Sequence, residues 1–432
     1  MLSLKKLILK NTLWSGIGEI ISKGIQFLLI IILARYLSAA DFGKFSFVFS
    51  FVPIFLIIAD FGLHFISIRE ISRNLEQTKK YLSNIFTIKL ILAFLAFLSI
   101  FIISQFLGKN NETKILIYIY GLYTILWSFC EFFYTIFKAW EKFKYEALIK
   151  TTHILTLFTF ITLLILNHKG LKEIILAYLF AISLIFIIVI TIIAAKFTKF
   201  HLSFDAPLWK HLFKESWPLA LSSVFAIIYY RIDTTMISLM KGDQDTAWYF
   251  APYNLVFGLT FIPLFMMHSF YPKMSQIWHQ SLLRQGFGGQ AKNQLKILYR
   301  KIMLLIGGLA GLMLIGIYFL ADKIIILLYG SQYTPSILAL KILVIAVFFS
   351  YFSHVFLFTL TAMNQQKIYT YITAVGCAFN LIANFIFIPK YSFIGASWTT
   401  VATELITGLL LLIFVTKLLK NFAPAKIVNP NN

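Results

Sequence analysis

The run from Ile174 to Ala195, IILAYLFAISLIFIIVITIIAA, contains no charged residue. A helix needs only about 20 apolar residues to cross the hydrocarbon core of a bilayer, so this run is long enough to span a membrane. Similar runs recur along the chain, in which 59% of the residues are hydrophobic and 13% are charged. A soluble domain has roughly a quarter of its residues charged. The sequence therefore predicts an integral membrane protein and excludes a water-soluble fold.

The apolar runs divide the chain into about twelve predicted transmembrane helices. They cover residues 11–34, 45–66, 82–107, 115–137, 148–167, 172–195, 215–240, 248–271, 302–320, 337–362, 368–389 and 393–416. The expected fold class is an all-α polytopic membrane protein.

The formal net charge of +21 results from 38 Lys+Arg against 17 Asp+Glu. Nucleic-acid binding would call for a clustered basic patch, whereas these basic residues lie in the short gaps between apolar runs. Most of them fall at the N-terminus and in every second gap, as Lys79 and Lys80 do. Lysine and arginine mark cytoplasmic loops. We therefore expect both termini to be cytoplasmic and no nucleic-acid partner.

The two halves of the chain resemble each other weakly. The matching segments are 10–47 with 214–250, and 139–170 with 362–392. An even number of predicted spans separates the copies, so the halves have the same orientation, as in parallel-repeat transporters. This predicts two six-helix lobes, residues 1–205 and 206–432, joined by the basic loop Lys196 to Lys214 as a hinge.

Polar side chains form stripes within several spans. Ser15, Glu19, Ser22 and Gln26 share one face of the first span, as do Ser397, Thr400, Glu404 and Thr407 in the last, and Asn380 pairs with Asn384 at i, i+4. Serine, threonine and asparagine can simply bridge helices in a bundle. A charge at the centre of a span costs about 2.5–3.5 kcal/mol. Glu19 and Glu404 are therefore expected to face a cavity or a partner.

The stretch YYRIDTTMISLM (229–240) places Arg231 and Asp233 in an apolar segment. Residues two apart do not face each other on a helix, so these two do not form a private ion pair. Two interpretations of Arg231 follow from the residues alone. The arginine either snorkels to the headgroups or locks the bundle, or it lines an aqueous cavity where it meets an anion.

Two further features predict no site. Cys130 and Cys377 lie in apolar runs, which favours buried free thiols. The segment RQGFGGQA (284–291) formally fits a dinucleotide fingerprint. That motif needs a preceding strand and a following acidic residue, and a membrane helix follows here instead. We expect a flexible loop and no cofactor.

Four segments carry a resemblance to a known family. They are LARYLSAADFGKFSFVFSF (33–51), DFGLHFISIREISRN (60–74), RIDTTMISLMKGDQDTAWYFAPYNLV (231–256) and IPKYSFIGASWTTVATE (388–404). The chain resembles the oligosaccharide-lipid flippases of bacterial polysaccharide biosynthesis, of the O-antigen flippase type, in the multidrug/oligosaccharidyl-lipid/polysaccharide exporter superfamily. The likeness covers residues 8 to 417. The glycine-rich 284–291 loop and the Trp140-Glu141 pair depart from it.

The resemblance implies two six-helix lobes around a central cavity, in a bacterial or archaeal cell membrane. The implied cargo is a polyprenyl-pyrophosphate-linked oligosaccharide, carried from the cytoplasmic to the outer leaflet for surface polysaccharide synthesis. Pyrophosphate and sugars cannot cross hydrocarbon unassisted. The implied mechanism is alternating access by rocking of the lobes, not enzymatic catalysis. A polysaccharide polymerase and glycosyltransferases are candidate partners.

The resemblance also suggests roles for individual residues. Arg231 is the expected phosphate contact, and the expected sugar contacts are Tyr229, Tyr230, Asn380 and Asn384. The candidates for carrying a coupling proton or sodium ion are Glu19, Asp233 and Glu404.

Two other functions compete with this one. An exporter of small cationic drugs in the same superfamily would use the buried acids as its substrate site, and Arg231 would not help it. A membrane glycosyltransferase or polymerase would need catalytic groups on sizeable outer loops. Among the predicted outer loops, only Lys323 to Lys341 exceeds a turn or two.

Overall fold

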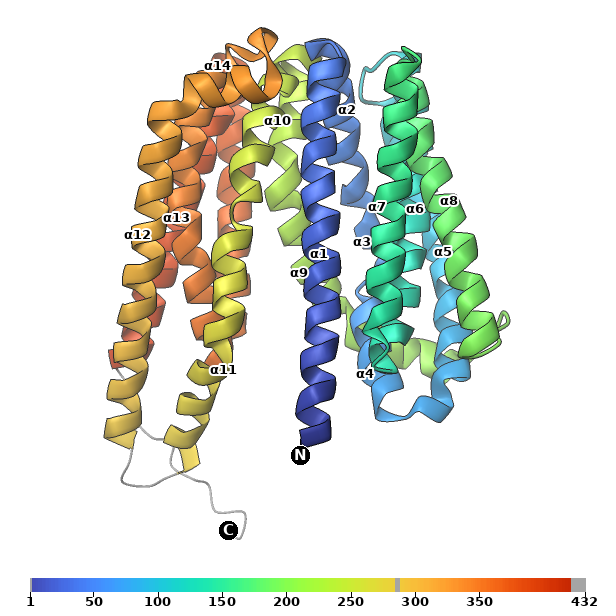
Figure 1. The fold of residues 1–432 in the computed structure, drawn as a ribbon, viewed down its shortest axis with the longest axis vertical. Helices are drawn as coiled ribbons and strands as arrows, with labels where there is room; N and C mark the ends of the chain where they lie inside the picture. Colours follow the sequence, from blue (N-terminus) through green and yellow to red (C-terminus); the bar gives the residue numbers. More distant parts are fainter. Residues whose placement is uncertain (1, 284–287, 421–432) are drawn as a thin grey trace. The chain divides into compact units, whose positions relative to one another are not determined.

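The computed structural model describes residues 2–283 and 288–420, and every regular element in these ranges is a helix (Figure 1). The α-helices are α1 (Leu2–Tyr36), α2 (Ala39–Phe51), α3 (Leu56–Asp60), α4 (Leu63–Arg73), α5 (Thr78–Gln105), α6 (Asn111–Ala139), α7 (Phe143–Leu166), α8 (Leu171–Lys196), α9 (Ala206–Met240), α10 (Asp243–Gly258), α11 (Phe261–Leu283), α12 (Gly288–Tyr329), α13 (Ser336–Ala362) and α14 (Gln366–Lys420). Three short 3-10 helices are η1 (Val52–Phe55), η2 (Leu75–Gln77) and η3 (Ser331–Tyr333).

Within the described residues, nine helical stretches are long and apolar enough to cross a membrane. The prediction of an all-α polytopic membrane protein is confirmed. The number of twelve spans stays a prediction.

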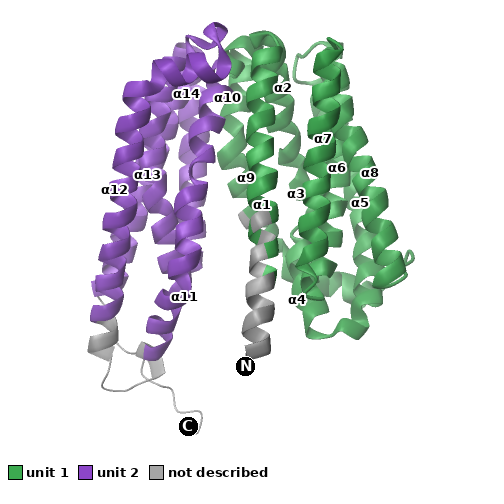
Figure 2. Cartoon of the chain, viewed as in Figure 1, with its two compact units in different colours: residues 1–247 green, residues 248–432 purple. Residues whose placement is uncertain are grey.

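The chain forms two compact units, Met1–Ala247 and Trp248–Asn432 (Figure 2). In the first unit α1 packs against α7, α6 against α8, and α2 against α9. In the second unit α13 packs against both α12 and α14. Helix α9 contacts α2 and α4, so it packs with the first unit. The lobe boundary at residue 205 was inferred from a sequence repeat and stays a prediction.

The predicted span 45–66 is not one continuous helix. It is divided into α2, η1 and α3, and the chain then turns before α4 begins at Leu63. The turn is made by Phe61 and Gly62, whose φ angles of 48° and 72° lie in the left-handed region. Glycine adopts this conformation at little cost, and Pro53 at the start of η1 lacks the N–H that a continuing helix would use. The result is a charged residue, Asp60, at an interrupted helix end.

Two connections also differ from the expected boundaries. Helix α12 continues to Tyr329, so the outer loop expected at Lys323 to Lys341 is reduced to residues 330–335. Helix α14 covers the last two expected spans, with a non-helical break at Ser392 (φ 50°, ψ −138°). The glycine-rich segment 284–291 lies partly outside the described residues.

The loop between α8 and α9 is anchored to α5. The backbone N–H groups of Ser203 and Asp205 donate to the Thr87 hydroxyl at 3.0 Å and to the Asn84 amide oxygen at 2.9 Å. The Trp209 indole also donates to Asn84 Oδ1, at 3.0 Å. These bonds hold the predicted hinge loop against the first unit, and its role as a hinge stays a prediction.

The prediction that both cysteines are buried thiols outside any disulfide is confirmed. Cys130 belongs to the apolar core of the first unit, where it lies among Phe129, Phe132 and Phe133. This core packs α6 against its neighbours and so fixes the position of that helix.

Candidate functional site

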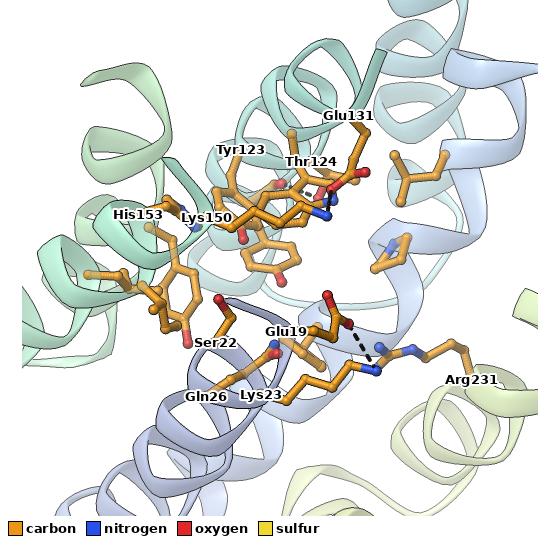
Figure 3. Close-up of a pocket in the computed structure, with 18 residues that line it drawn as sticks. Glu19, Ser22, Lys23, Gln26, Tyr123, Thr124, Glu131, Lys150, His153 and Arg231 are labelled. Carbon is orange, nitrogen blue, oxygen red and sulfur yellow. Dashed lines mark hydrogen bonds and ion pairs between the residues drawn. The ribbon is translucent and has the colours of Figure 1, made fainter. Parts of the chain in front are cut away.

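The first unit contains a cavity of about 340 Å³, lined by residues of α1, η1, α2, α3, α6, α7, α8 and α9 (Figure 3). Its ionisable lining consists of Glu19, Lys23, Glu131, Lys150, His153 and Arg231. Its aromatic lining consists of Phe49, Tyr120, Tyr123, Trp127 and Tyr178. Ligand sites commonly combine an aromatic wall with a few convergent polar groups. We call this space the anion cavity, because Lys23, Lys150 and Arg231 line it.

Arg231 reaches the anion cavity from α9. Its guanidinium carbon lies 4.7 Å from the centroid of the Phe49 ring of α2. A guanidinium at this distance over an aromatic face is stabilised by a cation–π interaction. A guanidinium carries its N–H donors in a planar fork that matches phosphate oxygens. The contact with Phe49 thus holds the arginine side chain at the wall of the cavity.

Lys150 of α7 is held by two carboxylates. Its ammonium lies 3.2 Å from Glu131 of α6 and 2.9 Å from Glu146, one turn earlier on α7. Glu146 also pairs with Lys138 at 3.1 Å. A charge in a low-dielectric interior is tolerated when it is paired and hydrogen-bonded. The network therefore keeps an ammonium group at the cavity wall with its charge shared among several partners.

Glu19 and Lys23 are adjacent on α1 and form an ion pair of 3.1 Å (Figure 3). Their side chains are 41% and 53% exposed. An ion pair as open as this contributes little to stability. The pair therefore contributes little to holding the cavity wall together.

His153 of α7 is 4% exposed, and its Nε2 has no hydrogen-bond partner among the described residues. Its ring lies 6.3 Å from the Tyr123 ring and 5.3 Å from the Trp127 ring. A buried polar atom without a partner points to water or a ligand as its partner. The imidazole thus adds a polar position to an otherwise aromatic wall.

The structure brings together only part of the predicted site. Arg231 and Glu19 line the anion cavity. Tyr229 and Tyr230 are outside its lining and contact each other edge to face, with ring centroids 5.4 Å apart. Asp233 is 4% exposed on α9 and is also outside the lining.

The remaining predicted residues lie in the second unit, in a buried polar cluster on α14. Asn384 donates to Asn380 at 3.1 Å, and Asn380 donates to Thr403 at 3.5 Å. Glu404 is 3% exposed, next to Thr403 in the chain. The interrupted α14 therefore gathers the amide pair, the threonines and the carboxylate on facing segments of one hairpin. Their predicted roles in binding sugar or a coupling ion stay predictions.

Lys150, Glu131 and His153 line the anion cavity and were not assigned to a site from the sequence. Lys150 lies at the start of the predicted span 148–167, and it was counted with the basic residues of the preceding gap as a topology signal. Glu131 lies within the predicted span 115–137, and an ionisable residue inside a membrane segment is a candidate functional group by default. The position of Glu131 in an apolar span could therefore have identified the face of α6 that lines the cavity.

The described fold is similar to those of two solved proteins. An inward-facing multidrug resistance MATE family transporter of the MOP superfamily matches with a TM-score of 0.72 and 14% identity, over 96% of this chain and 100% of the other. The lipid II flippase MurJ, in an inward closed conformation, matches with a TM-score of 0.71 and 17% identity, over 93% of this chain and 87% of the other. At these identities the likeness shows the fold alone.

The sequence comparison is more specific. The family model described as "Polysaccharide biosynthesis protein" matches residues 8–278, and the chain belongs to this family. A curated relative, the probable low-salt glycan biosynthesis flippase Agl15 of Haloferax volcanii, is 26% identical over 89% of this chain and 78% of its own. The predicted family resemblance is confirmed.

Proposed function

We propose that this protein is a lipid-linked oligosaccharide flippase, which moves polyprenyl-pyrophosphate-linked sugar units from the cytoplasmic to the outer leaflet. The observation that carries the proposal is the anion cavity, where Arg231, Lys150 and Lys23 line the same space. The family of the chain and the flippase name of the Haloferax volcanii relative support it.

The chemistry of the cavity suits a diphosphate joined to a sugar. Three cations face two carboxylates, Glu19 and Glu131, so the lining has an excess of positive charge. The arginine supplies a planar pair of donors and the lysines supply point charges, which are the two modes by which proteins hold phosphate. The aromatic wall with Tyr123 and Trp127 offers flat surfaces to a sugar ring.

The competing functions fit less well. A small cationic drug would meet the positive charge of Arg231 and Lys150, which disfavours its binding. A glycosyltransferase or polymerase would need catalytic groups on an extended outer loop, and the connection after α12 is only residues 330–335. Both the lining charge and the short connection support transport rather than sugar transfer.

The remaining parts of the proposal concern the transport cycle and its setting. The two lobes rock to give alternating access, driven by a proton or sodium ion carried at Glu19, Asp233 or Glu404. The protein lies in a bacterial or archaeal cell membrane with both termini in the cytoplasm. It receives its cargo from glycosyltransferases and delivers it to a polymerase for O-antigen, capsule or exopolysaccharide.

Replacing Arg231 tests the proposal directly. Charge-assisted hydrogen bonds contribute about 1.5–3 kcal/mol each, so their loss weakens binding roughly tenfold or more. We expect Arg231→Ala to give a folded, inserted protein, cells that lack surface polysaccharide, and lipid-linked units accumulating on the cytoplasmic side. Arg231→Lys should be intermediate, because an ammonium lacks the planar fork.

Arg300→Ala is the matched control, because Arg300 is exposed on α12 and outside the cavity lining. It should retain surface polysaccharide at the wild-type level. Normal polysaccharide in Arg231→Ala cells at matched expression would remove the arginine from the transport mechanism.

A further inference from the structure

A second group of ionisable side chains lies where α3 ends and the chain turns into α4. The Lys89 ammonium of α5 is completely buried and donates to Asp60 Oδ1 at 2.9 Å. It also donates to the Ala59 carbonyl at 3.1 Å and to the Ser128 hydroxyl at 2.7 Å. The other carboxylate oxygen of Asp60, Oδ2, contacts Nδ1 of His64. Asp60 therefore bridges a lysine and a histidine.

The interrupted helix explains why these charges are placed here. Ending α3 at Asp60 leaves the Ala59 carbonyl without its next helical donor, and the buried Lys89 supplies one. The lysine has a carbonyl, a hydroxyl and a carboxylate as acceptors, so it forms the fixed part of the group. Ionisable residues within membrane segments usually mark ion pathways or proton relays. Histidine is the side-chain type that most often serves as a proton shuttle in proteins.

The Asp60–His64 pair faces a second cavity of about 190 Å³. The Asp60 and His64 side chains are 18% and 31% exposed, whereas Lys89 is 0% exposed, so the imidazole is accessible and the lysine is sealed. Glu131 and Trp127 line this cavity and also the anion cavity. Glu131 thus stands between the two spaces, and it pairs with Lys150 at 3.2 Å.

We infer that the Asp60–His64 pair is a proton-binding site that is linked to the anion cavity through Glu131. The linkage to an anion rests on the proposed function. The ionisable groups around the pair come from each neighbouring helix: Asp60 from α3, His64 from α4, Lys89 from α5 and Glu131 from α6. The described lining from α9 is uncharged and consists of Ala220, Ser223 and Ile227.

His64 and the anion cavity are linked because protonated His64 and Lys150 compete for the Glu131 carboxylate. With His64 neutral, Asp60 and Lys89 cancel each other, and Glu131 is held by Lys150. A proton on His64 adds one positive charge next to the second cavity and draws the Glu131 carboxylate toward it. The Lys150 ammonium then loses part of its partner and is more available to a diphosphate. Because linkage is reciprocal, a bound diphosphate favours proton uptake by the same factor.

The test uses the purified full-length protein and inorganic pyrophosphate, with binding measured by calorimetry at about pH 6 and about pH 8. The protonation of pyrophosphate itself changes with pH in the same way in every experiment. A difference in pH dependence between two protein variants is therefore a property of the protein. We expect the affinity gain at the lower pH to be about fivefold larger in the wild type than in His64→Gln. Glu131→Gln should lose the same extra gain, because it removes the shared carboxylate.

His354→Gln is the control, because His354 is a partly buried histidine of the second unit, bonded to the Ser350 carbonyl at 2.9 Å. It should match the wild type. An equal pH dependence in the wild type and in His64→Gln would overturn the linkage.

A second measurement decides the proton site without any anion. In protein labelled with 15N-histidine, the His64 resonance is identified by its loss in His64→Gln. It should move with pH in the range in which imidazoles titrate, and Glu131→Gln should alter that movement. A resonance that stays constant with pH overturns the proton site. If the wild type binds no pyrophosphate while His64 titrates, the proposed function fails and the proton site stands.

Discussion

Lys89, Lys150 and Arg231 show three ways in which this chain keeps a cation within apolar helices. Lys89 is completely buried and bonded to a carboxylate, a carbonyl and a hydroxyl. Lys150 is shared between two carboxylates, and Arg231 lies over an aromatic ring. Removing one partner of a buried ion pair typically costs about 3–5 kcal/mol. Lys89 is therefore suited to a structural role, while Lys150 and Arg231 retain contact with a cavity.

Asp205 provides a residue-scale prediction outside the apolar spans. Its carboxylate accepts from the Leu208 N–H at 3.0 Å, as the N-cap of α9, and pairs with Lys80 at 3.0 Å. The hydrogen bond from Leu208 and then the contact with Lys80 lower the pKa of Asp205. A lowered folded-state pKa stabilises the protein above the unfolded value of about 3.9, and the contribution is lost as pH falls through the folded value.

We therefore expect Asp205→Ala to lower the melting temperature of the purified protein at neutral pH. Asp205→Asn should lower it less, because asparagine retains the capping acceptor. The difference between wild type and Asp205→Asn should shrink as the pH approaches the acid range. Equal melting temperatures for all three proteins at neutral pH would show that neither cap nor ion pair contributes.

At the scale of elements, α2 and the turn between α9 and α10 approach each other without space for a side chain. A Cβ placed on Gly43 would lie 1.6 Å from the backbone oxygen of Asp243. Asp243 is itself held by Lys109 at 2.7 Å and by Ser238 at 2.6 Å. The turn therefore cannot move aside without breaking these bonds.

Gly43→Ala should consequently destabilise the protein by at least about 1–3 kcal/mol, the usual range for overpacking a closed site. Thermal unfolding of the purified protein measures the change. Gly311→Ala on α12 is the control, since nothing lies within 4 Å of its added Cβ, and alanine is the better helix former. If Gly43→Ala were as stable as the wild type, α2 and the turn between α9 and α10 would be able to move apart without loss of stability.

At the scale of the whole molecule, the distribution of basic residues predicts which loops face the cytoplasm. Asn111, Gln244 and Lys79 are exposed at helix ends. In a background in which Cys130 and Cys377 are replaced by alanine, cysteines at 111 and 244 should react with an impermeant thiol reagent in intact cells. A cysteine at 79 should react only after permeabilisation. Labelling of position 79 from outside would reverse the orientation.

The local sequence pattern was sufficient to predict a membrane protein, a helical fold and the family. A run such as 174–195 has one low-energy conformation in a bilayer, because a helix satisfies its own backbone hydrogen bonds. The same pattern also singled out Arg231 and Glu19, since a charge within a span is costly wherever the neighbouring helices lie. Both residues line the anion cavity.

Only the tertiary structure decided which side chains meet. Lys150 acquires Glu131 as a partner because α6 and α7 pack together, and these residues are not neighbours in any local pattern. The left-handed turn at Phe61 likewise ends α3 and brings Asp60 to Lys89, although hydropathy alone predicts one unbroken span there. Hydropathy and helical periodicity indicate whether a residue faces lipid, water or protein. They do not indicate which side chain it contacts, because that depends on packing between segments far apart in the chain.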